Sequence, residues 1–252
     1  MHSDSSVGFD EPRAERKNWG GFASFSGVLM LGSLPTSTLS ALLPPPLRLM
    51  PVAANGRHPL VLIFGEMSRG GAHIGGVDIP GGGSYREVGI MLPFVQHPAC
   101  AGPVVFPYRM YADDVRPVFL GNSCYGLRKD FATIDWSGPT FQVLRGSRRH
   151  FGAAGAIEGS WSALDPERNA AFRPIREIFR LPILGRRGLG KFVRLFFEWS
   201  FDSVEAADFS GDVELLLEDS NQVLRLSSQG ASVSAIRGLG WRTSAPNVLP
   251  NE

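Results

Sequence analysis

Residues 121–136 read GNSCYGLRKDFATIDW and place Lys129 in an apolar segment punctuated by glycine. The chain has 25 lysine and arginine residues, and only three of them are lysine: Lys17, Lys129 and Lys191. Arginine and lysine are not interchangeable, because only the lysine amine readily loses its proton and becomes a nucleophile. Lys129 is therefore either a surface charge or an amine that the chemistry requires.

A strand over residues 129–136 would place Lys129 on one face with Phe131, Thr133 and Asp135, and Asp130 on the other face. A pocket with apolar walls disfavours an ammonium ion, and a neutral amine can attack a carbonyl carbon. The alternative is an exposed lysine at the start of a strand, whose charge reaches out to solvent. Spacing alone favours the exposed lysine, because lysine is rarely buried.

Several other segments alternate between apolar and polar residues with period two, which indicates half-buried strands. Short strands joined by glycine- and proline-rich turns favour an α+β, mainly antiparallel β fold with a few short helices. We expect one barrel-like domain over residues 19–242, with flexible tails at 1–18 and 243–252, and a cavity lined by EVGIMLPFV (87–95) and DFATIDW (130–136). The other strand segments are LVLIFGEM (60–67), SYREVGIMLPFV (84–95), KFVRLFFEWSFD (191–202) and DVELLLE (212–218).

Three short helices are expected at 36–44, 111–121 and 169–179. The first would have a threonine or serine N-cap, and the second would carry Asp113 or Asp114 in its first turn. The segment SRGGAHIGGVDIPGGGS (68–84) has seven glycines but no phosphate-binding pattern, so we interpret it as a flexible excursion between two strands.

Composition excludes several classes of function. Apolar residues make up 43% of the chain and the net charge is +1, which argues against a nucleic-acid-binding protein. The basic run Arg145, Arg148, Arg149 and His150 is interpreted as a solvated strand end rather than a phosphate site. The longest apolar stretch, 27–47, is interrupted by polar residues and prolines, so no membrane span is expected.

Cysteines and histidines show no metal-binding pattern. Cys100 and Cys124 lack C-x-x-C spacing, and the histidines have no ligand spacing, so no metal is predicted. The polar N-terminus does not resemble a secretory signal, and a cytoplasmic protein is the expectation.

The segments SYREVGIMLPFV (84–95) and VVFPYRMYADDVRPVFLGNSCYGLRKDFATI (104–134) resemble the acetoacetate decarboxylase-like superfamily. Its members show a Y-x-E strand, a stretch rich in tyrosine and proline with paired aspartates, and a block close to G-R-E-x-x-G-x-P-K-K-x-A. In this chain the block runs from Gly121 to Ala132. LSALLPPPL (39–47) extends the resemblance, which covers about residues 22–136 of a divergent member. It implies a cone-like or barrel-like fold with a central pocket.

The resemblance also implies roles for individual residues. Lys129 matches the lysine that forms a Schiff base with a ketone, a chemistry for which acetoacetate decarboxylase is a standard example. Glu87 matches the glutamate of Y-x-E, and Glu66 stands near a second acid on the preceding strand; both are expected to move protons. The residues expected to contact the substrate are Tyr85, Met91, Tyr111, Tyr125 and Arg109, although each tyrosine is also explained by packing.

The block departs from the family pattern at several positions. Asn122 and Ser123 replace Arg-Glu, Arg128 replaces the proline, and Asp130 replaces the second lysine. The arginine that meets a substrate carboxylate has no clear match, and Arg48 or Arg109 could take its place.

The resemblance predicts a lyase that forms a lysine imine with a small carbonyl substrate, such as a keto acid. It needs no cofactor, and the reaction is decarboxylation or the aldol and dehydration chemistry of secondary metabolism. A homo-oligomer is also implied. The alternative is a non-catalytic small-molecule binding protein on the same fold, because fold does not fix function.

Overall fold

The computed structural model describes residues 19–52, 55–81, 83–165, 169–170, 172–217, 221–229 and 231–250. The predicted N-terminal tail lies outside these residues. The strands are β1 (Trp19–Pro35), β2 (Arg48–Leu49), β3 (Arg57–Ile74), β4 (Val77–Pro80), β5 (Tyr85–Gln96), β6 (Val104–Ala112), β7 (Lys129–Phe131), β8 (Thr133–Ser137), β9 (Thr140–Arg145), β10 (Arg148–Ala163), β11 (Ile183–Arg186), β12 (Phe192–Leu195), β13 (Phe197–Ser200), β14 (Glu205–Leu217), β15 (Gln222–Ser227), β16 (Ser232–Ser244) and β17 (Asn247–Val248). The helices are α1 (Thr36–Ser40), α2 (Val115–Leu120), the π-helical turn η1 (Gly121–Tyr125), α3 (Arg173–Phe179) and the 3₁₀ turn η2 (Gly188–Gly190).

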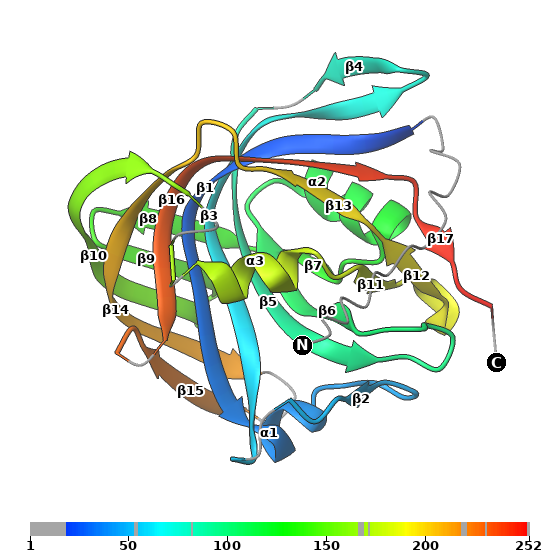
Figure 1. The fold of residues 1–252 in the computed structure, drawn as a ribbon, viewed down its shortest axis with the longest axis horizontal. Helices are drawn as coiled ribbons and strands as arrows, with labels where there is room; N and C mark the ends of the chain where they lie inside the picture. The colour runs from blue at the N-terminus through cyan, green and yellow to red at the C-terminus, as the bar shows by residue number, and fades with distance from the viewer. Residues whose placement is uncertain are drawn as a thin grey trace, which may run out of the picture.

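The architecture is a large, strongly curved and mainly antiparallel sheet, with α3 lying across one side of it (Figure 1). Long strand β1 pairs with β3 on one edge and β16 on the other, and the pairing continues from β3 through β5 to β6. From β16 the sheet continues through β14 and β10 to β9 and β8. The predicted α+β, mainly antiparallel class is confirmed.

The sheet does not close into a barrel. Between β6 and β9 the connection passes through two short strands: β7 pairs in parallel with β6, and β8 pairs with β9. The predicted strand over 129–136 is therefore broken at Ala132. Of the four residues predicted to share one face of this strand, only Lys129 is buried. The other three, Phe131, Thr133 and Asp135, are exposed.

The sheet has apolar side chains on both faces. One group, which we call the strand-side cluster, includes Phe64, Val88, Ile90, Phe141 and Phe151. The other, the helix-side cluster, includes Met91, Met110 and Phe25, together with Ile175 and Ile178 of α3. Because β5 is buried on both faces, its sequence is apolar almost throughout instead of alternating.

The short helices lie where the sequence predicts them, with different ends. Helix α1 has Pro35 at its N-cap and no side-chain cap, so the expected threonine or serine cap is wrong. In α2 the Asp114 carboxylate caps the helix by accepting from the Arg116 N–H at 2.8 Å. Pro174 in α3 lies in the first turn, where its missing N–H costs no helical hydrogen bond.

Two boundaries differ from the prediction. The glycine-rich segment is a β-hairpin of β3 and β4 that projects from the body (Figure 1, top), because Gly75 and Gly76 both have positive φ and form a tight turn. The expected C-terminal tail is also wrong for residues 243–250. Val248 pairs with Val193 of β12, and Ala245 and Leu249 are buried.

No helix among the described residues has the length and hydropathy that a membrane span requires.

Candidate active site

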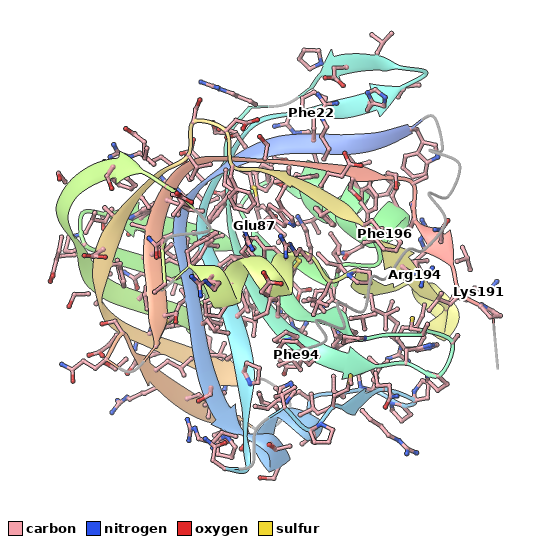
Figure 2. The ribbon with its side chains drawn as sticks, in the orientation of Figure 1. Phe22, Glu87, Phe94, Lys191, Arg194 and Phe196 are labelled. Carbon is pink, nitrogen blue, oxygen red and sulfur yellow. The ribbon has the colours of Figure 1, made fainter. Side chains whose placement is uncertain are left out.

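Lys129 and Glu87 form a buried ion pair. Lys129 opens β7 opposite Met110 of β6, and Glu87 of β5 lies opposite Ala112 of the same strand. The Lys129 Nζ donates to Glu87 Oε2, and the two side chains are only 7% and 2% exposed. Figure 2 shows Glu87 in the interior of the molecule, whereas the exposed Lys191 lies at its edge. The two residues come together as predicted, whatever their chemistry.

Tyr85 extends this pair along the same face of β5. Its hydroxyl donates a hydrogen bond to Glu87, and its ring centroid lies 5.7 Å from the Lys129 Nζ. Burial raises the pKa of the Tyr85 hydroxyl well above its ordinary range, and the negative charge of Glu87 raises it further. The hydroxyl therefore remains protonated and serves as a hydrogen-bond donor to the carboxylate.

The backbone before Lys129 has an unusual conformation. A π-helical turn, η1, follows α2 directly, and such turns are frequent at functional sites. Gly126 and Arg128 then adopt left-handed conformations with φ of 64° and 53°. A Cβ on Gly126 would lie 2.7 Å from the backbone of Arg186, so this position requires glycine.

Asn122 and Gly121 fix Lys129 from two sides. The Asn122 side chain accepts from the Lys129 N–H at 2.7 Å and donates to the Lys129 carbonyl at 2.7 Å. It thereby replaces a neighbouring strand along that part of β7. A Cβ on Gly121 would lie 2.8 Å from Lys129 Cδ, so the absence of a side chain leaves room for the aliphatic part of the lysine.

The helix-side cluster includes Met110, which lies opposite Lys129. Met91 follows Glu87 at a distance of four residues on β5 and is buried in the helix-side cluster with Met110. Tyr125 packs against the same cluster, with its ring 6.1 Å from that of Trp19. Burial, with a smaller effect of the neighbouring Cys124, raises the pKa of Tyr125 to about 12, which agrees with a packing role.

Three predicted residues lie on the opposite face of the sheet. Glu66 is opposite Arg86, whereas Gly65 is opposite Glu87, so the parity of β3 directs Glu66 away from the pair. The other two lie on the opposite face for the same reason, so the structure does not bring them to the pair. The Tyr111 hydroxyl lies 3.4 Å from His150 Nδ1, and Arg109 donates to Asp130 at 2.6 Å.

Neither a metal-binding cluster nor a described cavity includes the Lys129–Glu87 pair. No cluster of three or more histidine, cysteine, aspartate or glutamate residues that could hold a metal occurs in the described part of the chain. Two surface cavities, of about 570 and 630 Å³, are lined by residues other than Lys129 and Glu87. The central pocket around the lysine therefore stays a prediction.

Sequence reasoning missed Asn122 and Gly121 as supports of the lysine. Both positions stood in the motif, where Asn122 counted only as a departure from the family pattern. The asparagine itself could have indicated this role, because its side-chain amide has a donor and an acceptor like those of a peptide group and can replace a neighbouring strand.

Similarity to known proteins comes from solved structures. No protein-family model and no curated protein matches the chain. The structure is similar to the enduracididine biosynthesis enzyme MppR complexed with pyruvate, with a TM-score of 0.62 and 15% identity over 92% of this chain and 90% of that chain. An acetoacetate decarboxylase-like enzyme from Sphingomonas wittichii RW1 gives a TM-score of 0.61 and 15% identity, covering 94% of this chain and 95% of that chain.

Acetoacetate decarboxylase from Legionella pneumophila gives a TM-score of 0.58 and 16% identity over 99% of this chain and 98% of that chain. The chain has the acetoacetate decarboxylase-like fold. This confirms the resemblance drawn from the motifs at the level of architecture, and it extends the likeness past residue 136 to almost the whole chain. Structural similarity at 15–16% sequence identity establishes the fold alone. The reaction must be inferred from the residues of this chain, because fold does not fix function.

Proposed function

We propose that this protein is an enzyme that forms an imine between Lys129 and a small carbonyl compound. The observation that carries the proposal is the buried Lys129–Glu87 pair with the Tyr85 hydroxyl at its carboxylate. Removing each ion of a buried pair from water costs several kcal/mol, and apolar side chains of similar size would avoid this cost. Stability alone therefore does not explain why the Lys129–Glu87 pair is present.

Imine formation follows from these groups in balanced steps. Glu87 accepts a proton from the Lys129 ammonium, and the neutral amine attacks the carbonyl carbon. The attacking nitrogen passes one of its protons to the former carbonyl oxygen, and the resulting hydroxyl leaves as water after Glu87 returns its own proton to it. The bond between Lys129 Nζ and the former carbonyl carbon is then a C=N double bond, and Glu87 is again a carboxylate that balances the iminium charge.

The iminium then acts as an electron sink, so the lysine supplies the function of a cofactor. In a β-keto acid the electron pair of the carbon–carboxylate bond moves toward the imine and carbon dioxide leaves. Protonation of the enamine and hydrolysis by water release the ketone and restore Lys129. The same enamine can attack an aldehyde, which gives the aldol and dehydration branch. A structural relative, MppR, is described as complexed with the condensation product of pyruvate and imidazole 4-carboxaldehyde, and this supports a carbonyl substrate.

The second candidate is a non-catalytic small-molecule binding protein. The ion pair itself favours this candidate, because an ammonium held by a carboxylate is not a nucleophile until its proton moves. Asp130, which replaces the second lysine of the family motif, is held by Arg109 on the other face and places no cation beside the amine.

Borohydride trapping separates the two candidates. The protein is incubated with pyruvate, acetoacetate and a panel of larger keto acids, reduced, and analysed by intact mass and peptide mapping. We expect an adduct on the peptide containing Lys129, lost in Lys129→Met and retained in Lys191→Met, because Lys191 is exposed. If the keto acids bind but no compound yields an adduct, the binding-protein candidate replaces the enzyme.

A further inference from the structure

A surface cavity lies where β2 pairs with the end of β5, in the part of the molecule that also holds α1 (Figure 1, bottom). Its volume is about 630 Å³, which falls in the range of small-molecule sites. The lining consists of three prolines, two leucines, Arg48 and Gln96. A mainly apolar concave surface with a few polar groups is the usual composition of a small-molecule site.

One wall of the cavity is the turn of residues 44–47. The Leu47 N–H donates to the Pro44 carbonyl at 3.0 Å, and the Leu47 side chain is buried in the strand-side cluster. These contacts fix Pro45 and Pro46, which line the cavity. A proline side chain loses no rotamer freedom when a ligand packs against it, so this wall is preorganised for binding.

The facing wall is the turn of residues 97–100. The Cys100 N–H donates to the His97 carbonyl at 2.9 Å, and the Ala99 N–H donates to His97 Nδ1 at 3.1 Å. This turn carries Pro98, the third proline of the lining, which is exposed. Both walls therefore present apolar surface from a backbone that is already held in place.

The two polar groups of the lining stand directly opposite each other. Arg48 of β2 pairs with Gln96 of β5, so their side chains leave the same face of the sheet, and both are exposed. Within the described part of the chain the Arg48 guanidinium forms no ion pair and no hydrogen bond. The nearest residues in sequence outside that part, Ala53 and Ala54, carry no charge.

The lining therefore has one positive charge and no described acidic residue to balance it. A planar guanidinium offers two parallel N–H donors that match a carboxylate, and the Gln96 amide offers a further donor beside it. A single guanidinium balances one negative charge, whereas a phosphate monoester carries nearly two. The geometry thus favours a monoanion whose carbon chain can cover the prolines and leucines.

We propose that this cavity binds a small amphipathic monocarboxylate, with the carboxylate at Arg48 and the carbon chain on the proline walls. The site is separate from the Lys129–Glu87 pair. Gln96 is the last residue of β5 and Glu87 lies near its start, so roughly 30 Å of strand separates them at about 3.3 Å per residue. Arg48 is consequently too distant to meet the carboxylate of a substrate held at Lys129.

Isothermal titration calorimetry with hexanoate, hexanamide and acetate at about 0.15 M salt, where diffuse surface attraction is screened, tests the proposal. We expect hexanoate to bind saturably with a dissociation constant below about 10 mM. Hexanamide should bind about tenfold more weakly or worse, because it has the same chain without the charge. Acetate should also bind about tenfold more weakly or worse, because it lacks most of the apolar chain.

Two variants locate the probe. Arg48→Gln removes the charged donor and should weaken hexanoate binding about tenfold or more. Gln96→Glu keeps the size of the side chain but places a carboxylate opposite Arg48, which should repel hexanoate to a similar extent while the opposite-charge pair supports the strands. Arg225→Gln is the matched control, because it makes the same change of charge at a side chain that is 81% exposed on β15; it should leave the dissociation constant within about twofold.

The proposal is overturned if hexanoate does not bind saturably below about 10 mM, if hexanamide binds as tightly as hexanoate, or if Arg48→Gln and Gln96→Glu bind hexanoate no more weakly than Arg225→Gln does. Light scattering on the same variants tests another occupant, a second copy of the chain. Absence of hexanoate binding together with a smaller assembly in Gln96→Glu would assign this surface to a subunit interface. Borohydride trapping at Lys129 does not involve Arg48, so the two proposals fail separately.

Discussion

Separating the buried ion pair should strongly destabilise the protein, whereas removing both of its charges should not. Glu87→Gln retains the shape of the side chain and an acceptor for Tyr85 but leaves the Lys129 ammonium without its counter-ion. Lys129→Met leaves the Glu87 carboxylate without its cation. The double variant contains neither charge.

The expected magnitude follows from burial. Both side chains are more than nine-tenths buried, so solvent cannot replace the missing partner. Loss of one partner from such a pair costs about 3–5 kcal/mol, whereas replacement of both by uncharged groups is close to neutral. With a urea m-value of about 3 kcal/mol/M, a loss of about 4 kcal/mol lowers the denaturation midpoint by roughly 1.3 M. That loss is a large part of the roughly 5–15 kcal/mol that stabilises a typical domain.

Urea denaturation of the four proteins, followed by circular dichroism, measures the free energy of unfolding and the coupling between the two sites. We expect the double variant to be more stable than either single variant. Glu214→Gln is a control at the exposed ion pair with Arg149 and should cost no more than about 1 kcal/mol. If the losses of unfolding free energy in the two single variants add up in the double variant, the two charges do not depend on each other. That result, or single losses as small as that of the control, would refute a buried and coupled ion pair.

Three further variants test the surroundings of the lysine. Gly121→Ala keeps a helical φ of −57° but places a methyl group against Lys129 Cδ, so the adduct in borohydride trapping should fall while the far-UV spectrum is retained. Asn122→Ala removes both hydrogen bonds to the Lys129 backbone, and the midpoint in urea should reveal a loss of about 1–3 kcal/mol, whereas an unchanged midpoint would contradict the clamp. Because the pKa of Tyr85 is raised in the folded protein, above about pH 10 the unfolded chain loses the phenol proton and the folded protein keeps it. The free energy of unfolding should therefore fall by about 1.4 kcal/mol per pH unit. Tyr85→Phe should show a shallower decline, and a decline identical to that of the unsubstituted protein would argue against a buried phenol.

The sequence was sufficient for the strands and for the central pair. Period-two alternation places β14, and β5 is found as an apolar run. The motif brings Lys129 and Glu87 together because both belong to segments with a recognisable local pattern. It was less informative about which face a side chain joins. Glu66 and Arg109 lie one position out of phase with the site, and the face that each side chain joins depends on the register between strands, which leaves no local mark in the sequence.

Other errors have the same long-range origin. The glycine-rich segment forms a hairpin because its strands continue the sheet past the body, and Leu249 becomes ordered because it packs against distant strands. The turn at Gly75 and Gly76 is local, but the extension of the sheet past the body and the packing of Leu249 depend on residues outside the segments concerned. The clamp by Asn122 likewise depends on a π-helical turn that brings residues 122 and 129 face to face.

The left-handed conformation of Arg128 also bears on attempts to redesign this site. Proline is restricted to a φ near −65°, whereas residue 128 has a φ of 53°. Substituting the family's Pro-Lys-Lys at residues 128–130 would therefore change the backbone conformation immediately before Lys129. We expect this change to break the two hydrogen bonds between Asn122 and the Lys129 backbone. A transplant that respects the local geometry would exchange the whole turn from residue 121 to 129, with Arg128→Gly as the conservative change that the backbone accepts. Lys129 and the turn before it thus form one structural unit, and a redesign has to transfer both together.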